Sequence, residues 1–183
     1  MLIEKTTITV DLEQIKRDLE QVLMIQDWPD SVEDPRFPKN QICLTHREGS
    51  SSPWLEGNGS LKESGLQEKD FCIFNDDIPE YTRSVLENLA RQEGVKFGRI
   101  RYMKLMPKTG LTVHIDNEYR YHLVLQTNRF AMFGHIYEGA EELGKVYHIP
   151  ADSTFYKVDT RLGHFVYNGG WEERIHLVIC VVE

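Results

Sequence analysis

The segment Tyr119-Arg120-Tyr121-His122-Leu123-Val124-Leu125-Gln126 is one of a series of short stretches after Gly94 in which alternating or β-branched residues recur between turn residues. Alternation with a period of two is typical of a strand with one face buried. About eight such segments at short intervals predict an all-β barrel or sandwich. They are residues 97–106, 111–115, 119–126, 130–137, 145–149, 153–158, 164–167 and 174–182.

The residues before this β-rich part predict two helices. A helix begins after the N-cap candidate Asp11 and ends near Asp27, with Leu12, Ile15, Leu19, Val22 and Leu23 on its apolar face and Lys16, Arg17, Asp18 and Glu20 outside. A second helix is predicted to be opened by Asp76 or Asp77, to carry Pro79 in its first turn and to stop at Gly94. Residues 6–10 and 41–46 are expected to be strands, and residues 28–40 a loop. Helices followed by a run of strands predict a mainly β jelly roll with N-terminal helices packed on one sheet.

The length of 183 residues favours a single domain over 1–183, with a helical and loop part at 1–96 and a β core at 97–183. Residues 46–70 are rich in glycine and serine and read as a long loop. A loop of this length is either a cover for a substrate, with Trp54 as part of it, or a surface excursion.

Composition excludes some classes of protein. With 40% hydrophobic and 27% charged residues the chain is not a disordered one, and its net charge of −8 argues against binding to duplex nucleic acid. Cys43, Cys72 and Cys180 lack the C-x-x-C spacing and are expected to be buried thiols. No apolar run approaches the roughly 20 residues that cross a bilayer. We therefore expect a cytoplasmic protein, whose oligomeric state the sequence does not indicate.

Three residues of the β-rich part form a candidate metal site. In a strand, His114 and Asp116 face the same side, and His164 lies at the start of another predicted strand. Two histidines and one carboxylate form the facial triad of non-haem Fe(II) oxygenases. The competing interpretation of His114 and Asp116 is a hydrogen-bonded pair at a strand end. His176 is a rival for His164, but it lies two residues after Arg174 on the same strand.

Arg174 is a candidate for binding an anion. It begins the alternating segment Arg174-Ile175-His176-Leu177-Val178-Ile179, which places Arg174, His176 and Val178 on one face of a strand. A guanidinium inside a barrel needs an anionic partner, because an unpaired buried charge is costly. The planar fork of arginine suits a carboxylate such as the C5 carboxylate of 2-oxoglutarate.

Taken together, the segments 119–128, 163–168 and 174–177 resemble the aspartyl/asparaginyl β-hydroxylase-like branch of the 2-oxoglutarate oxygenases. The resemblance covers about residues 97–183 and rests on the His-x-Asp pair, the Arg-x-His-Leu strand, the distal histidine with its following asparagine, and the arginine ten residues beyond that histidine. It implies a double-stranded β-helix, Fe(II) at His114, Asp116 and His164, and 2-oxoglutarate at Arg174, with O₂ as the second cosubstrate.

The resemblance also implies that Arg120 and His122 help to bind the cosubstrate, although an outward-facing polar row is the alternative for these two residues. Some animal members carry glycine where Asp116 stands, so this chain is more similar to the bacterial free-amino-acid hydroxylases, such as proline hydroxylases. His135 and His148 are expected to be surface or satisfied core histidines, and Trp28, Trp54 and Trp171 are more often packing residues.

Two classes of function compete on these observations. The first is an Fe(II)- and 2-oxoglutarate-dependent dioxygenase that hydroxylates an amino acid, a peptide side chain or a related small metabolite. The second is a cupin-like module that binds a metal or a small molecule without oxygenase activity, since the β fold would be the same. A cupin isomerase or dioxygenase with a second ligand set is a further class, but no second set is found in the sequence. Arg174 beside the triad favours the oxygenase.

Overall fold

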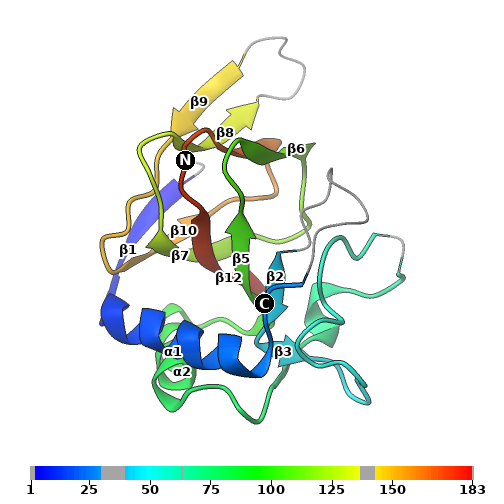
Figure 1. Ribbon diagram of the computed structural model, residues 1–183. Coiled ribbons are helices and arrows are strands. Elements are labelled where there is room, and N and C mark those ends of the chain that lie inside the picture. The colour runs from blue at the N-terminus through cyan, green and yellow to red at the C-terminus, as the bar shows by residue number, and fades with distance from the viewer. Residues whose placement is uncertain (1–2, 30–39, 63, 137–142, 183) are drawn as a thin grey trace.

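The structure is a computed structural model that describes residues 3–29, 40–62, 64–136 and 143–182. Two helices, one short 3₁₀ helix and twelve strands lie within these residues (Figure 1). In chain order they are β1 Ile3–Thr9, α1 Leu12–Ile25, β2 Gln41–Cys43, β3 Thr45–His46, η1 Glu68–Asp70, β4 Ile73–Phe74, α2 Glu80–Glu93, β5 Phe97–Leu105, β6 Thr109–His114, β7 Arg120–Gln126, β8 Ala131–Ile136, β9 Leu143–Tyr147, β10 Thr154–Val158, β11 His164–Asn168 and β12 Arg174–Val181.

The strands form two main sheets that face one another. The major sheet has the order β1-β10-β7-β12-β5-β2, and the minor sheet has the order β6-β11-β8-β9. β3 and β4 form a separate pair. All of the pairings between these strands are antiparallel. This arrangement is a double-stranded β-helix, so the predicted jelly roll with N-terminal helices is confirmed.

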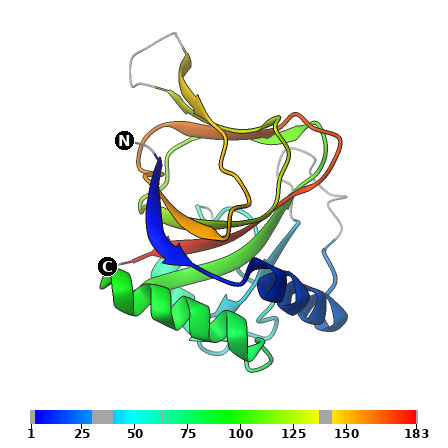
Figure 2. The same ribbon diagram turned by 90° about the vertical axis from the view of Figure 1, so that its left-hand side faces the viewer.

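Both helices cover the outer face of the major sheet (Figure 2). Their buried side chains, including Ile15 and Leu86, pack against one face of that sheet, to which Tyr102, Leu123 and Leu177 belong. The opposite face of the major sheet meets the minor sheet in a second apolar cluster that contains Val124 and Phe133. Because β12 lies between β7 and β5, all eight of its residues are buried. Its alternation therefore sends Leu177 towards the helices and His176 into the barrel.

All eight segments predicted as strands in residues 97–182 are strands, with shifted ends. Among these eight, the largest shift is that of β9, which spans 143–147 where 145–149 was predicted. Outside this part of the chain, the strand predicted at 6–10 spans 3–9. Both predicted helices are present, and the side chain of Asp11 accepts a hydrogen bond from the Gln14 backbone N–H at 3.0 Å, as an N-cap does. The predicted start of the second helix is wrong, because α2 begins at Glu80 with Pro79 as its N-cap residue, and neither Asp76 nor Asp77 caps it. Residues 30–39 of the predicted loop and Tyr137 of a predicted strand lie outside the described residues.

Two predictions about burial are wrong. Cys72 is exposed, whereas Cys43 and Cys180 are buried, because residue 72 lies outside the sheets, between η1 and β4. Asp18 was placed on the outer face of the first helix but is only 1% exposed. One oxygen of its carboxylate accepts hydrogen bonds from the backbone N–H and the hydroxyl of Thr82, at 2.9 and 2.7 Å.

Asp18 therefore caps the neighbouring helix. Thr82 lies in the first turn of α2, and the N-cap position of that helix is Pro79, which has no side-chain hydrogen bond to offer. A carboxylate at a helix N-terminus satisfies free backbone N–H groups and interacts favourably with the helix dipole. The cap thus joins α1 to α2 where local sequence could not provide one.

No helix among the described residues is long and apolar enough to cross a membrane.

We expect Asp18→Ala to lower the free energy of unfolding by about 3 kcal/mol, because it leaves a buried N–H and a buried hydroxyl without their charged acceptor. Asp11→Ala, which removes the exposed cap of α1, should cost only about 1 kcal/mol. Denaturant unfolding of the two variants measures the difference. An equal or smaller loss in Asp18→Ala would show that the cap between the helices does not stabilise the fold.

Candidate active site

The pairing of β6 with β11 brings two of the predicted metal ligands together. His164 is the register partner of His114, and their ring centroids are 4.2 Å apart. Asp116 was expected on the same strand face as His114, but β6 ends at His114 and Asp116 lies two residues beyond it. Its position is fixed instead by its backbone N–H, which donates to the carbonyl of Thr160 at 2.9 Å.

Backbone carbonyls orient both imidazoles. The Nδ1 of His114 is 2.7 Å from the carbonyl oxygen of Thr112, and the Nδ1 of His164 is 2.9 Å from that of Leu162. A carbonyl can only accept, so each Nδ1 carries the proton and each Nε2 presents a lone pair. These Nε2 atoms lie 3.9 and 3.7 Å from Oδ2 of Asp116. The three candidate ligand atoms all lie within 4.8 Å of one another.

The chemistry of this cluster fits a divalent metal. Oδ2 of Asp116 is buried and has no hydrogen-bond partner in the part of the chain that the structure describes, and such an oxygen is costly unless something binds it. Burial lowers the pKa of His164 to about 4, with a smaller contribution from His114, so this imidazole is neutral at neutral pH. Two neutral imidazoles and one carboxylate are the ligand set of the Fe(II) facial triad. The Phe133 ring stacks on His164, with a centroid distance of 5.3 Å, and covers it.

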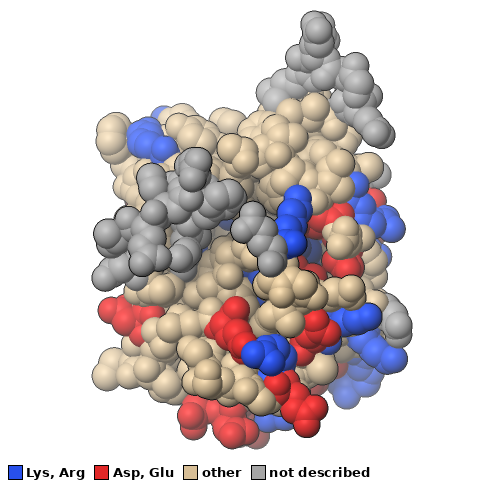
Figure 3. All heavy atoms as spheres, turned by 90° about the vertical axis from the view of Figure 1, so that its right-hand side faces the viewer, with Lys and Arg blue, Asp and Glu red and all other residues tan. Residues whose placement is uncertain are grey.

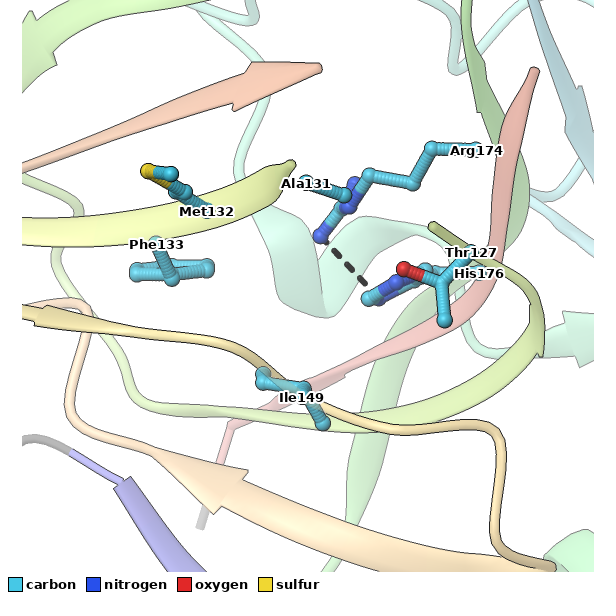
Figure 4. A pocket seen from close by; sticks show the side chains of 7 residues that line it. All are labelled: Thr127, Ala131, Met132, Phe133, Ile149, Arg174 and His176. Carbon is cyan, nitrogen blue, oxygen red and sulfur yellow. Dashed lines mark hydrogen bonds between the residues drawn. The ribbon is translucent and has the colours of Figure 1, made fainter. Parts of the chain in front are cut away.

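Arg174 lies in a small pocket inside the barrel (Figure 4). Its side chain extends from β12 towards Ala131, and no carboxylate among the described residues forms an ion pair with it. Burial alone lowers the pKa of its guanidinium to about 9, so the group is still charged at neutral pH. The side chains that line the pocket are Thr127, Ala131, Met132, Phe133, Ile149, Arg174 and His176.

His176 contacts Arg174 and does not belong to the cluster of His114, Asp116 and His164. Its Nδ1 accepts a hydrogen bond from Nη2 of Arg174 at 3.1 Å and is 3.3 Å from Nδ1 of His122. Because Nδ1 of His176 acts as an acceptor, the proton of this ring is on Nε2, and His122 donates through its own Nδ1. Burial holds the pKa values of both rings well below the ordinary value, assisted by the charge of Arg174. The Nε2 atoms of both rings are buried without partners.

The structure therefore brings His164, and not His176, together with His114 and Asp116. His122 was predicted to face the barrel, and it does, from the centre of the major sheet between Val178 and Tyr156. Arg120 also points inward, but its present partners are carboxylates. Its Nη2 is 3.0 Å from Oδ1 of Asp116 and 3.4 Å from Oε1 of Glu68.

Sequence reasoning missed three residues of the site. Glu68 lies in the predicted loop, and Thr127 and Phe133 line the pocket of Arg174. The hydroxyl of Thr127 is buried and has no hydrogen-bond partner. No motif marked Glu68 or Thr127. The predicted strand at 130–137 could have placed Phe133 in the interior by alternation.

Two residues that were expected to have structural roles do so. Trp54 is partly buried and packs against the core, and Nδ1 of His148 lies 3.0 Å from the carbonyl oxygen of Ala131.

The comparisons with known proteins concern the family and the fold of this chain. The sequence model of the family Aspartyl/Asparaginyl beta-hydroxylase matches residues 10–183. No curated protein sequence matches the chain. Among solved structures, AviO1 from Streptomyces viridochromogenes Tue57 aligns over 99% of this chain and 89% of its own, with a TM-score of 0.58 and 14% identity.

Two further solved structures are similar to this chain to different extents. A prolyl hydroxylase from Trichoplax adhaerens, solved with a peptide fragment of hypoxia inducible factor, aligns over 98% of this chain and 81% of its own, with a TM-score of 0.57 and 10% identity. An oxidoreductase of the 2OG-Fe(II) oxygenase family from Burkholderia pseudomallei aligns with 17% identity and a TM-score of 0.47. That alignment spans 57% of each chain, so this chain covers just over half of the length of the Burkholderia protein.

We expect the protein to bind one Fe(II) per chain, and His114→Ala and His164→Ala to abolish this binding, because each removes one of three ligands. His176→Ala should retain the metal, since His176 contacts Arg174 and His122 instead. Anaerobic dialysis followed by metal analysis measures the stoichiometry. Loss of iron in His176→Ala with retention in His164→Ala would overturn this choice of ligands.

A pH dependence of stability is expected from Glu68. Burial by itself would raise the pKa of this carboxyl, but Arg101, Arg99 and Arg120 lower it from 4.5 to about 2. A depressed pKa contributes stability above the unfolded value, on the order of 3 kcal/mol here, and this is lost as the pH falls from about 4.5 towards 2. The gap in unfolding free energy between wild type and Glu68→Gln should therefore narrow over this range. A gap that stays constant with pH would contradict the shift.

Proposed function

Because the chain belongs to the aspartyl/asparaginyl β-hydroxylase family, we propose that it is an Fe(II)- and 2-oxoglutarate-dependent dioxygenase that hydroxylates an amino acid, a peptide side chain or a related small metabolite. Family and fold together point to a hydroxylase of the 2-oxoglutarate oxygenase type. The single observation that carries the finer proposal is the buried guanidinium of Arg174, in the same barrel as a His-Asp-His cluster. Among the described residues, Arg174 has no acidic partner and Oδ2 of Asp116 has no hydrogen-bond partner.

In the proposed reaction, His114, Asp116 and His164 hold Fe(II). The bound metal and its cosubstrates 2-oxoglutarate and O₂ supply the oxidising chemistry, with release of succinate and CO₂. The carbonyls of Thr112 and Leu162 keep each imidazole in the tautomer that can bind a cation. The protein thus contributes ligands whose orientation is fixed before the metal arrives.

Arg174 is assigned to the C5 carboxylate of 2-oxoglutarate. A carboxylate there would receive charge-assisted hydrogen bonds from the guanidinium, and the Thr127 hydroxyl in the same pocket is a second free donor. The contact with His176 fixes one Nη2 of Arg174 and so limits how the fork can turn. Phe133 lines the pocket and also covers His164, so it forms a common wall between the carboxylate site and the metal cluster.

Arg120 and His122 are proposed to help bind the same cosubstrate. His122 lies next to His176 and contacts Phe133 edge-on, with a centroid distance of 5.8 Å. The Nε2 atoms of His122 and His176 are both buried and have no hydrogen-bond partner among the described residues. Arg120 brings a positive charge to within 3.0 Å of Asp116. The charge of Arg120 and the Nε2–H of His176 favour an anionic ligand over a neutral one, whereas the unprotonated Nε2 of His122 can only accept a hydrogen bond.

The alternative is a cupin-like module that binds a metal or a small molecule without oxygenase activity. The fold does not separate the two, because the same β architecture hosts both. The Arg174 pocket does favour one of them, because a metal-binding module has no need for a buried guanidinium beside its metal. The substrate is proposed as a small molecule or a peptide, and a screen of free amino acids and short peptides for succinate release tests which of them is used.

We expect Arg174→Ala to weaken binding of 2-oxoglutarate and to leave Fe(II) binding nearly intact. Truncating one member of a desolvated charge pair costs on the order of 2–5 kcal/mol, which is roughly a 30-fold or larger rise in dissociation constant. Arg174→Lys should recover part of the affinity, because it keeps the charge and loses the planar fork. Titration of 2-oxoglutarate into the anaerobic Fe(II) protein, followed by metal-to-ligand charge-transfer absorption, measures this.

Arg161→Ala is the matched control, since Arg161 is exposed and pairs only with Asp159 among the described residues. It should titrate as wild type does. The same curve for Arg174→Ala and wild type, or no charge-transfer band in the wild type, would favour the cupin-like binding module.

A further inference from the structure

A series of largely buried ion pairs connects the His-Asp-His cluster to the long loop at residues 47–70. Nη2 of Arg120 lies 3.0 Å from Oδ1 of Asp116 and 3.4 Å from Oε1 of Glu68. Glu68 in turn pairs with Arg99. Arg99 donates through Nε and Nη2 to the two carboxylate oxygens of Glu68, each at 2.7 Å. The side chains of all four residues are at most 15% exposed. Figure 3 views the side of the molecule on which this loop lies in Figure 1, and acidic and basic side chains gather there next to one another.

At the loop end of this series of ion pairs, Arg99 and Glu68 are fixed by further contacts. Nη1 of Arg99 donates to the carbonyls of Gly57 and Gly59, at 2.6 and 3.0 Å. The short helix η1, which begins with Glu68, lies directly against β5, where a Cβ at Gly98 would be only 2.3 Å from the carbonyl oxygen of Glu68. Glycine at position 98 therefore permits this close approach. Glu68 is fixed both by its backbone and by its partner Arg99.

The position of Arg120 between two carboxylates affects the metal ligand. A guanidinium commonly binds a carboxylate through two parallel hydrogen bonds. The close contact of Arg120 with Asp116 joins Nη2 to Oδ1 at 3.0 Å, and the same Nη2 lies 3.4 Å from Oε1 of Glu68. Oδ2 of Asp116 is left buried and without a hydrogen bond. If Arg120 turned fully to Asp116, it would occupy the oxygen that the metal needs.

We propose that Glu68 is a positioning residue of the metal site, which holds Arg120 against Oδ1 of Asp116 and so keeps Oδ2 free for the metal. This inference rests on the proposed function, because it takes the His-Asp-His cluster to be a metal site. Glu68 touches neither the metal nor the substrate in this assignment and acts through Arg120. The metal ligand is thereby coupled to the loop at 47–70.

Co(II) binding to the metal-free protein, followed by its visible d–d absorption, tests the inference without any turnover. We expect Glu68→Gln, which keeps the shape of the side chain, to raise the Co(II) dissociation constant about 10-fold or more, as loss of a residue that orients a ligand does. Glu68→Asp keeps the charge and shortens the side chain. We expect it also to weaken Co(II) binding, because the shorter side chain changes the position of the carboxylate, and wild-type Co(II) binding in Glu68→Asp would contradict the positioning role.

A double-mutant cycle identifies the route of the effect. In an Arg120→Met background, Glu68→Gln should no longer change the Co(II) dissociation constant, because the guanidinium that it positions is absent. A direct electrostatic effect of Glu68 on the cation would persist in that background. Glu56→Gln is the control, since Glu56 lies in the same loop but pairs with Arg47. It should bind Co(II) as wild type does.

The outcomes separate the two proposals. A wild-type protein that binds neither Co(II) nor Fe(II) overturns the proposed function, and the positioning role with it. Wild-type binding that is unchanged in either Glu68→Gln or Glu68→Asp overturns the positioning role alone, as does a loss that persists in the Arg120→Met background. Thermal unfolding of each variant verifies that it is folded, and Glu68→Asp, which can keep its pair with Arg99, decides the matter if Glu68→Gln does not fold.

Discussion

The antiparallel register that sets His164 opposite His114 is the constraint on which the rest of the candidate site depends. A slip of one residue between β6 and β11 would turn one imidazole to the outer face of the minor sheet and disperse the cluster. The minor sheet supplies both imidazoles, whereas Arg174, Arg120 and His122 come from the major sheet. The site therefore exists only because the two sheets face each other with their registers intact, and these residues are spread over about a third of the chain, from His114 to Arg174.

The barrel interior is polar where the site requires it and apolar elsewhere. Val124, Phe133 and Val166 belong to the apolar cluster between the sheets, while Arg174 and His176 project from the central strand into the same interior. A buried guanidinium without an acid lowers the stability of the fold. Its retention in the most protected strand of the major sheet is easier to explain by an anionic ligand than by any contribution to folding.

Much of the fold and part of the site could be predicted from the sequence because they depend on local pattern. Alternation identified all eight strands of residues 97–182, and the spacing of His114, Asp116, His164 and Arg174 pointed to residues that the fold gathers in one barrel. The pattern could not show that Asp116 lies past the end of its strand, that Asp18 is buried as a cap for the other helix, or that Glu68 reaches Arg120. These features depend on partners 44 to 64 residues away or on backbone contacts between loops, as in Asp116 with Thr160, Glu68 with Arg120 and Asp18 with Thr82. A helical or strand period carries no information about such partners.

The position of β12 also constrains the order in which the protein can be assembled. It follows every other strand of the major sheet in the chain, yet it lies between β7 and β5. Until residues 174–181 have been synthesised, the central position between β7 and β5 is empty, and the edges of these two strands that pair with β12 have no partner. Unpaired strand edges are prone to pair with other chains. The major sheet therefore cannot be completed until β12 has been synthesised. A premature stop codon within β12 would divide the major sheet into two parts. Loss of an edge strand, in contrast, would leave the rest of the sheet paired.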